Sequence, residues 1–195
     1  MKDSKEMNDF IQASLNETLI VIQKIGPECS SSITKAAELI IQAFRNGHKL
    51  LICGNGGSAA DSQHIAAEIV VRFQKNRSGL PAIALTTDTS ILTACSNDYG
   101  FNHIFERQVE ALGQTDDIFV GLSTSGTSEN IVLAMEKAKA LKMICIAMTG
   151  EKSGPLNKMA DVAIQIPSSV TARVQEGHIT VGHLICDLIE REMFP

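Results

Sequence analysis

The feature that most constrains the fold is a short apolar run that leads straight into a glycine-rich turn and then a helical pattern. Leu50 to Cys53 are apolar and short enough for a buried strand. The letters GNGG follow, and the helical segment continues to Phe73. Ser58 is placed to cap that helix, with Asp61 three residues on as in a capping box. Such a helix start presents free N–H groups, which is a typical place for a phosphate.

A second unit of the same kind follows the apolar run from Asp117 to Leu122. That run leads into the letters STSGTSEN, and a helical pattern continues from 131 to 141. The loop is rich in hydroxyls, which together with free N–H groups suit a phosphate monoester; they are Ser123, Thr124, Ser125, Thr127 and Ser128. Neither G-x-x-x-x-G-K-[ST] nor G-x-G-x-x-G is present. An ordinary capped loop is the alternative interpretation.

Strands and helices alternate along most of the chain. Further strands are expected at 82–85, 143–148 and 162–166, with helices at 104–112 and 171–193, and with a helix start at Ser90 before a turn-rich segment, ACSNDYGFN. This rhythm predicts an α/β fold, a three-layer α/β/α sandwich around a five-stranded parallel sheet. Both Gly- or Ser-rich loops lie at carboxyl ends of strands. We therefore expect them to open on one edge of the sheet, where ligands bind.

Two helices are expected before the first strand. Apolar residues recur at helical spacing over 5–25, Gly26-Pro27 interrupts the pattern, and a second pattern covers 30–44. These helices carry no visible chemistry, so residues 1–47 are interpreted as a segment that packs on the domain or on another subunit. No linker composition divides residues 1–195, which favours a single domain.

Four polar residues share one face of the helix after GNGG, because they follow one another at spacings of three, four and four: Asp61, His64, Glu68 and Arg72. His64 and Glu68 lie one turn apart and could share a metal ion or act on one small substrate. The alternative is a solvated polar face with an i, i+4 pair. A helix that starts at a buried strand usually packs on the sheet, which favours the functional interpretation.

The C-terminal helix carries polar residues within an otherwise apolar pattern: Arg173, Gln175, Glu176, His178 and His183. One histidine on an apolar helix is more often a core residue than a ligand. Two histidines with a glutamine and an arginine indicate a site. Gln175 and His183 are eight residues apart, about 12 Å along a helix. They can meet at one atom only with full side-chain reach, with a frayed helix start, or from different subunits.

Charge and composition exclude several classes of protein. The chain has 17 Lys and Arg against 22 Asp and Glu, a net charge of −5. No block of like charges stands out, which argues against an extended nucleic-acid footprint and leaves only a local patch as an alternative. No apolar run approaches the roughly 20 residues of a membrane span, and no signal peptide is visible. The five cysteines are widely spaced without a C-x-x-C pair, so neither a disulfide framework nor a zinc ribbon is indicated and the cytoplasm is expected.

Four motifs in order resemble one known family. They are CGNGGSAADSQHIAAE, LTTDTSILTACSNDYGFN, GLSTSGTSEN and ARVQEGHITVGHLICDLIE, and the likeness runs from about residue 30 to the end. The chain resembles the sugar isomerase (SIS) family, most closely its phosphoheptose isomerases, which act on sedoheptulose 7-phosphate in lipopolysaccharide heptose synthesis. The resemblance implies the SIS fold and an aldose–ketose isomerase that forms D-glycero-D-manno-heptose 7-phosphate through an enediol. It also implies a homotetramer with active sites between subunits.

The resemblance also assigns roles to single residues. Glu68 and His183 match the acid–base pair of the family. The ligands of a Zn²⁺ ion reported for some members match His64, Glu68, Gln175 and His183. Contacts to the sugar phosphate would come from Asn55, Gly56, Gly57, Ser58, Glu68, Asn97, Asp98, Ser123, Thr124, Ser125, Ser128 and Gln175.

Two positions depart from the family pattern, and one relative offers a second hypothesis. Gly177 stands where a methionine is usual, and Ala172 stands where some relatives have a carboxylate. The ending CDLIEREMFP resembles the DnaA initiator-associating protein, a non-catalytic relative that binds a replication initiator. That branch lacks the helix glutamate and the final histidine, whereas this chain has Glu68 and His183. The first hypothesis is therefore the isomerase.

Overall fold

The chain forms a sheet of parallel strands in the order β2-β1-β3-β4-β5. The computed structural model describes residues 4–195, so residues 1–3 of the predicted N-terminal segment lie outside it. Each strand pairs parallel to its neighbour, with Gly54 of β1 beside Leu122 of β3. The strands are β1 (Leu50–Gly54), β2 (Ala82–Ala84), β3 (Ile118–Ser123), β4 (Ile144–Thr149) and β5 (Val162–Gln165). The predicted five-stranded parallel sheet is confirmed.

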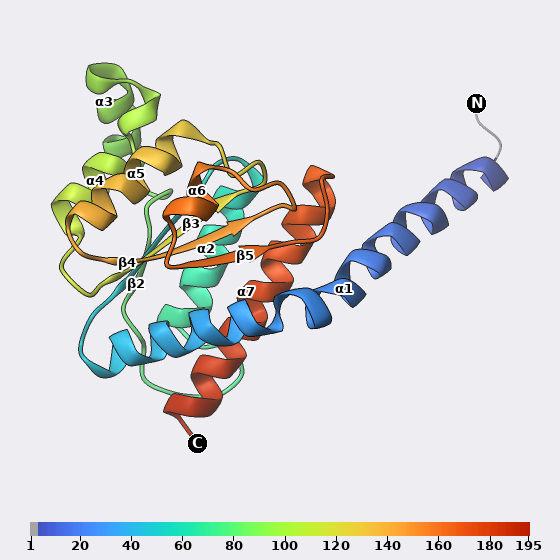
Figure 1. Cartoon of the computed structure of the whole chain (residues 1–195), viewed down its shortest axis with the longest axis horizontal. Coiled ribbons are helices and arrows are strands. Elements are labelled where there is room, and N and C mark those ends of the chain that lie inside the picture. Colours follow the sequence, from blue (N-terminus) through green and yellow to red (C-terminus); the bar gives the residue numbers. More distant parts are fainter. Residues whose placement is uncertain (1–3) are drawn as a thin grey trace.

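Helices cover both faces of this sheet, which confirms the three-layer arrangement (Figure 1). Successive side chains of a strand point to opposite faces. Leu50 and Ile52 accordingly lie in one core, and Leu51 and Cys53 in the other. The first core lies under α1 (Ser4–Arg45), α2 (Gly57–Val70) and α7 (Thr171–Met193). The second lies under α3 (Thr89–Tyr99), α4 (Glu106–Leu112), α5 (Glu129–Ala140) and α6 (Pro155–Met159).

The two expected N-terminal helices are a single one, so the prediction of a break at Gly26-Pro27 is wrong. α1 runs from Ser4 to Arg45 with Pro27 inside it. An interior proline lacks one N–H and crowds the carbonyl four residues earlier. This kinks the helix and destabilises it by about 3 kcal/mol. Figure 1 shows the bend. The helix continues because its second half, from Ile25 to Phe44, is a packed stripe against α7 and β5.

The segment expected to be turn-rich is mostly helical, and that prediction is also wrong. The Asp88 carboxylate accepts a hydrogen bond from the Ile91 N–H at 2.9 Å and caps α3, one residue earlier than expected. The helix then continues through the Asn97-Asp98 pair. It ends at Gly100, whose φ of 94° suits glycine. A good cap therefore outweighs the weak helix propensity of Ser, Asn and Asp. The short helix α6 and a 3₁₀ turn at Phe101–His103 carry no pattern that predicted them.

Two further expectations concern the whole chain. Within residues 4–195, no helix is both long enough and apolar enough to cross a lipid bilayer. All five cysteines are free and buried, so they serve as small apolar core residues. The loops after β1 and β3 lie side by side at the carboxyl edge, because these two strands pair directly.

Candidate active site

The turn between β1 and α2 depends on a glycine. Gly56 has a φ of 54° and is the N-cap of α2, which begins at Gly57. The predicted cap at Ser58 is wrong, because Ser58 is buried inside the first turn and no side chain caps α2. Asp61 is no capping-box partner either: its Oδ2 is buried without a partner, and this burial raises its pKa. The first N–H groups of α2 are thus left for a ligand.

Asn55 joins this turn to the second loop. The side chains of Asn55 and Asn130 exchange two hydrogen bonds of 2.9 Å, in which each amide donates to the carbonyl oxygen of the other. Asn130 is buried in the first turn of α5. The sequence analysis gave Asn130 no role. Its hydrogen bonds to Asn55 can be foreseen only once β1 and β3 are known to be neighbours.

The hydroxyls after β3 bind one another. Ser123 Oγ lies 2.9 Å from Ser128 Oγ and 3.4 Å from Ser125 Oγ, which lies 2.9 Å from Thr127 Oγ1. Ser128 is the N-cap residue of α5, but its side chain caps no N–H of that helix. Gly126, with a φ of 70°, makes the turn. Convergent hydroxyls beside a helix start without a side-chain cap form an anion-binding arrangement.

A cavity of about 440 Å³ borders the same loop. It is lined by the loops after β3, β4 and β5: Thr124, Ser125, Thr127, Glu151, Lys152, Ser153, Ser168, Ser169 and Thr171. Lys152 brings a cation to this edge, and no sequence motif marks it, because it follows β4 and lies 27 positions after Ser125. The cavity therefore combines hydroxyls with one ammonium group, that of Lys152, and one carboxylate, that of Glu151.

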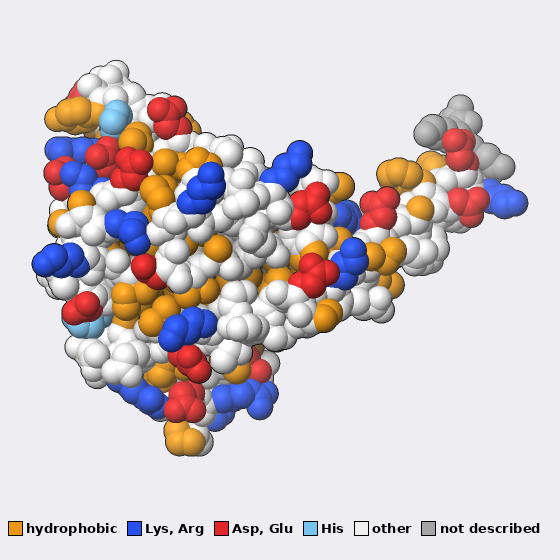
Figure 2. All heavy atoms as spheres, in the orientation of Figure 1, with side chains coloured by type: hydrophobic (Ala, Val, Ile, Leu, Met, Phe, Trp, Pro, Cys, Tyr) orange, Lys and Arg blue, Asp and Glu red, His pale blue; other side chains and the backbone are white. Residues whose placement is uncertain are grey.

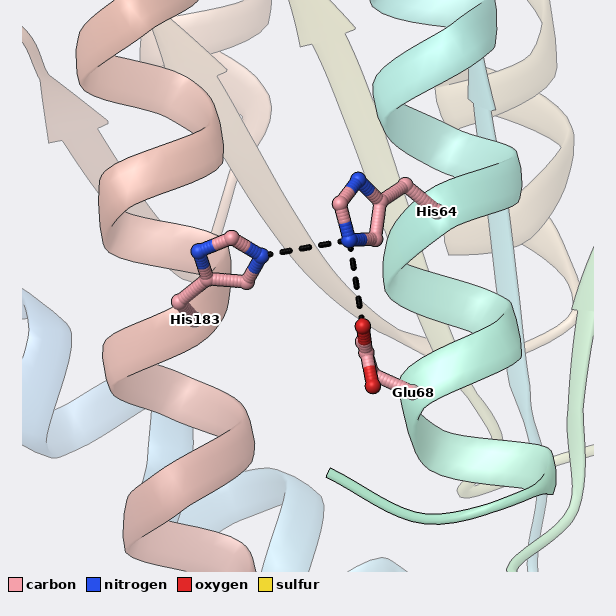
Figure 3. A group of neighbouring side chains, drawn as sticks. All are labelled: His64, Glu68 and His183. Atoms are coloured by element: carbon pink, nitrogen blue, oxygen red, sulfur yellow. Dashed lines mark hydrogen bonds and ion pairs between the residues drawn. The ribbon is translucent and has the colours of Figure 1, made fainter. Parts of the chain in front are cut away.

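Three side chains from two helices converge on one point (Figure 3). His64 and Glu68 lie one turn apart on α2, and His183 faces them from α7. His64 Nε2 lies 3.1 Å from Glu68 Oε1 and 3.3 Å from His183 Nε2. One ligand atom from each residue lies within 4.8 Å of the others. The structure thus brings together the residues in which the sequence analysis placed the chemistry.

Hydrogen bonds alone cannot satisfy His64 Nε2, Glu68 Oε1 and His183 Nε2 together when both imidazole rings are neutral. A neutral histidine Nε2 is either a donor or an acceptor. If His64 Nε2 donates to Glu68, its one hydrogen is not also available to His183. If it accepts from His183, its lone pair faces the Glu68 carboxylate. A cation satisfies all three atoms at once. Ligands of a tetrahedral zinc ion lie about 3.4 Å apart, since each is about 2.1 Å from the metal, so the two measured separations fit.

Three other predicted site residues do not join this cluster. Gln175 packs against Gly57, where an added Cβ would lie 2.6 Å from Gln175 Nε2. Gly57 precedes His64 by seven residues, about 10 Å along α2. Asn97 and Asp98 lie exposed near the end of α3, where Asn97 donates to Asp98 at 2.8 Å. Figure 1 shows that α3 projects from the face of the sheet opposite to α2 and α7.

The remaining polar residues of α7 are structural. His178 is fully buried with Nε2 3.3 Å from the Thr149 carbonyl oxygen, and burial lowers its pKa to about 4. It is the core histidine that the alternative interpretation describes. Arg173 donates to the carbonyl of Ser14 at 2.8 Å and pairs with Glu176, so these two residues fix the start of α7 to α1.

Packing explains one of the two departures from the family pattern. Gly177 is buried in α7, where an added Cβ would lie 2.6 Å from Ile166 Cγ2. The Ile166 side chain therefore occupies the room of a larger residue at position 177. Ala172 is exposed at the start of α7, and nothing in the structure explains it.

Comparisons with known proteins agree with this fold. The SIS domain matches residues 15–150, and the chain belongs to the SIS-domain family. It is 50% identical over 188 residues to the phosphoheptose isomerase of Geotalea daltonii, covering 96% of this chain and 98% of the relative. The structure of phosphoheptose isomerase GmhA from Neisseria gonorrhoeae is 43% identical with a TM-score of 0.90, covering 95% of this chain and 99% of that one. A phosphoheptose isomerase from Francisella tularensis is 38% identical with a TM-score of 0.92, covering 95% and 98%. Within the SIS-domain family, the chain belongs to the phosphoheptose isomerases.

Proposed function

We propose that this chain is an aldose–ketose isomerase that converts sedoheptulose 7-phosphate into D-glycero-D-manno-heptose 7-phosphate. The observation that carries the proposal is the meeting of Glu68 and His183, a carboxylate and an imidazole from two helices, at a short distance from two anion-binding loops. The names of the relatives at about half identity agree with this activity. The non-catalytic, initiator-binding alternative is not favoured, since it gives the cluster no role.

The distance between loops and cluster suits a seven-carbon substrate. α2 starts at the loops with Gly57 and reaches His64 about 10 Å further on. An extended seven-carbon chain measures roughly 10 Å from C1 to the phosphorus, because each bond of about 1.5 Å advances it by about 1.25 Å. A phosphate held where the two loops meet at the start of α2 therefore leaves C1 and C2 beside the cluster.

The reaction moves two protons and nothing else. A base removes a proton from C1 of the ketose, the enediol forms, and the proton returns to C2. Meanwhile one O–H proton moves from the C1 oxygen to the C2 oxygen. We assign Glu68 to the carbon-bound proton and His183 to the oxygens. General acid–base groups must lie within hydrogen-bond reach of the protons they move, and the two side chains flank one point.

The same three residues fit a divalent metal. Two imidazole nitrogens and one carboxylate oxygen are a zinc ligand set that leaves a fourth position open, and we propose that His64, Glu68 and His183 hold Zn²⁺. A coordinated nitrogen carries no proton, so His183 would serve the substrate oxygens only when its Nε2 is not bound to the ion, whereas Glu68 keeps a second carboxylate oxygen for the carbon-bound proton. Bound there, the ion would polarise the substrate carbonyl as a Lewis acid. Gln175 as a further ligand remains a prediction, and its position beside Gly57 requires it to swing out or to come from a neighbouring subunit.

We propose further that the protein assembles into a homotetramer through α1. The N-terminal half of α1 projects from the body with exposed apolar side chains (Figures 1 and 2): Met7, Phe10, Ile11, Leu15, Leu19 and Ile20. An exposed apolar stripe of this kind marks an interaction site. Asn97 and Asp98, remote from the cluster in one chain, would then serve the site of a neighbour. The free buried thiols support a reducing compartment such as the cytoplasm.

Two experiments test these proposals. Purified protein loaded with zinc should isomerise sedoheptulose 7-phosphate, and absence of turnover contradicts the function. For the shared site, mixing inactive Glu68→Gln with inactive Asp98→Ala subunits should restore part of the activity. Mixing Glu68→Gln with His183→Gln should restore none, because both residues belong to one chain's cluster. Rescue in the second mixture and not in the first would reverse this division.

A further inference from the structure

A buried carboxylate holds the segment that follows α2. Residues 71–79, here called the strap, lead from α2 back towards β2. Glu190 of α7 accepts hydrogen bonds from three consecutive strap N–H groups, those of Phe73, Gln74 and Lys75, at 2.7 to 2.9 Å. Only 1% of its side chain is exposed. Burial alone would raise the pKa of Glu190, but these bonds and Arg77 hold it at about 2, so the group is ionised at neutral pH.

Arg77 connects this carboxylate to the end of α2. Its Nε donates to Glu190 at 3.1 Å, and its side chain is only 3% exposed. Its two terminal nitrogens donate to the carbonyl oxygens of Glu68 and Ile69, each at 2.8 Å. The last carbonyls of a helix lack partners within it. The backbone of Glu68 is therefore fixed by a guanidinium that is itself fixed by α7.

The strap also supports the second residue of the acid–base pair. The Phe73 ring stacks on the His183 ring with centroids 5.5 Å apart and planes 28° apart. Because the ring and the N–H belong to one residue, the bond to Glu190 fixes the backbone from which the Phe73 ring reaches His183. Glu190 is seven residues after His183, two turns further along the same face of α7. One ion pair thus supports Glu68 through its backbone and His183 through its ring.

We propose that Arg77 and Glu190 are positioning residues of the isomerase site, which set the separation of Glu68 and His183. The inference rests on the proposed function. Neither residue has an atom in the three-residue cluster, so they act through other groups. Supporting residues of this kind matter because a small misplacement of reacting groups costs much rate. The opposing interpretation is a pair that stabilises the fold and does nothing specific for the site.

A matched control exists at the other edge of the sheet. Asp117 is also 1% exposed and accepts backbone N–H bonds, from Lys49 and Gln114, together with the Lys49 ammonium group. It precedes β3 and therefore lies at the amino edge, away from the cluster. Asp117→Asn and Glu190→Gln are the same chemical change in the same kind of environment. Asp117 accepts two backbone N–H bonds where Glu190 accepts three, and it pairs with Lys49 and His48 where Glu190 pairs with Arg77. The difference that the comparison uses is their distance from the site.

The experiment compares Glu190→Gln, Arg77→Met and Asp117→Asn with the wild type. Melting temperature, kcat and KM for sedoheptulose 7-phosphate, and the zinc affinity of the metal-free proteins against a chelator are measured. All three variants should melt earlier. Only Glu190→Gln and Arg77→Met should lose about tenfold in kcat and about tenfold in zinc affinity, with KM within about twofold.

Each outcome of this comparison either supports or overturns the positioning role of Arg77 and Glu190. Equal losses of kcat and zinc affinity in Asp117→Asn, or wild-type values in Glu190→Gln, overturn the positioning role. If Glu190→Gln does not fold, Phe73→Leu decides, because it keeps the three bonds to Glu190 and removes only the ring from His183. It should lower kcat and zinc affinity without changing KM, and no change overturns the proposal. If the wild type does not turn over sedoheptulose 7-phosphate, the function fails, and the zinc affinities alone decide on Arg77 and Glu190.

Discussion

The loops at the sheet edge and the seam between α2 and α7 differ in how their polar groups are satisfied. In the loops, hydroxyls bind each other, and Asn55 and Asn130 each donate one hydrogen bond to the other and accept one from it. In the seam, His64 Nε2 faces two partners that it cannot satisfy together. A self-satisfied loop can exchange its bonds for those of a phosphate at little cost. Between α2 and α7, the unsatisfied His64 Nε2 favours the binding of a cation or of a reacting group.

This difference separates binding from chemistry. A phosphate is remote from the reacting carbons and does not change during isomerisation, so contacts to it stabilise ground state and transition state alike. Contacts at C1 and C2 change along the reaction and act on turnover. Loop variants should therefore raise KM, and seam variants should lower kcat.

The largest effect is expected for Glu68→Gln. This change removes the proposed carbon base and the only anionic ligand of the cluster while keeping the shape of the side chain. General-base catalysis supplies about 10²- to 10⁴-fold, so kcat should fall by more than about 100-fold. Steady-state kinetics with zinc present checks the value. Turnover close to that of the wild type would remove Glu68 from this role.

His64→Ala should cost less than Glu68→Gln. It removes a proposed metal ligand but neither the acid nor the base. Loss of a ligand weakens metal binding, which mass action can offset, so added zinc should restore part of the activity. The measurement is kcat for both variants over a zinc titration. Equal losses that zinc does not relieve would show that the seam is not divided into coordination and chemistry.

Ser128→Ala tests the loops. The variant loses one hydroxyl from the Ser123 network and from the proposed phosphate site. A hydrogen bond to a charged group is worth about 1.5–3 kcal/mol, so KM should rise roughly tenfold or more with kcat little changed. Thr115→Ala is the control, since Thr115 is an exposed hydroxyl before β3 at the amino edge. A fall in kcat with unchanged KM would contradict the separation of roles.

The smallest effect is expected for the stability of the fold in mild acid, and it is smaller than the effects of the α2–α7 and loop variants. Burial lowers the pKa of His178 to about 4, so it stays neutral in the folded state while the unfolded chain takes up a proton near pH 6.5. The unfolded state then binds more protons between pH 6.5 and 4, and stability falls as the pH falls through this window. From pH 7.5 to 5.5 the loss should be about 1.3 kcal/mol. Urea unfolding of wild type and His178→Gln checks this, and parallel pH profiles would exclude His178 as the cause.

Local patterns predicted all five strands and the last helix, and they failed where tertiary contacts decide. β3, β4 and β5 lie within a residue or two of their predicted positions, and α7 begins and ends as expected. The break at Pro27 and the turn after Cys95 were wrong, because packing of α1 and the cap at Asp88 outweigh local propensity. The resemblance named the cluster residues. Arg77 and Lys152 belong to no motif, and Asn130 and Glu190 stand at the ends of two motifs in which nothing assigned them a role.

The sequence by itself determined the parallel sheet, the two anion-binding loops on one edge and the polar face of α2, because these follow from apolar periodicity and from the order of strand, turn and helix. Only the tertiary structure decided which polar residues meet. His64 and His183 are separated by 119 positions and touch because α2 and α7 both start at the carboxyl edge and pack side by side. Gln175, eight residues from His183 on the same helix, lies beside Gly57 instead, because each residue advances the helix by about 1.5 Å.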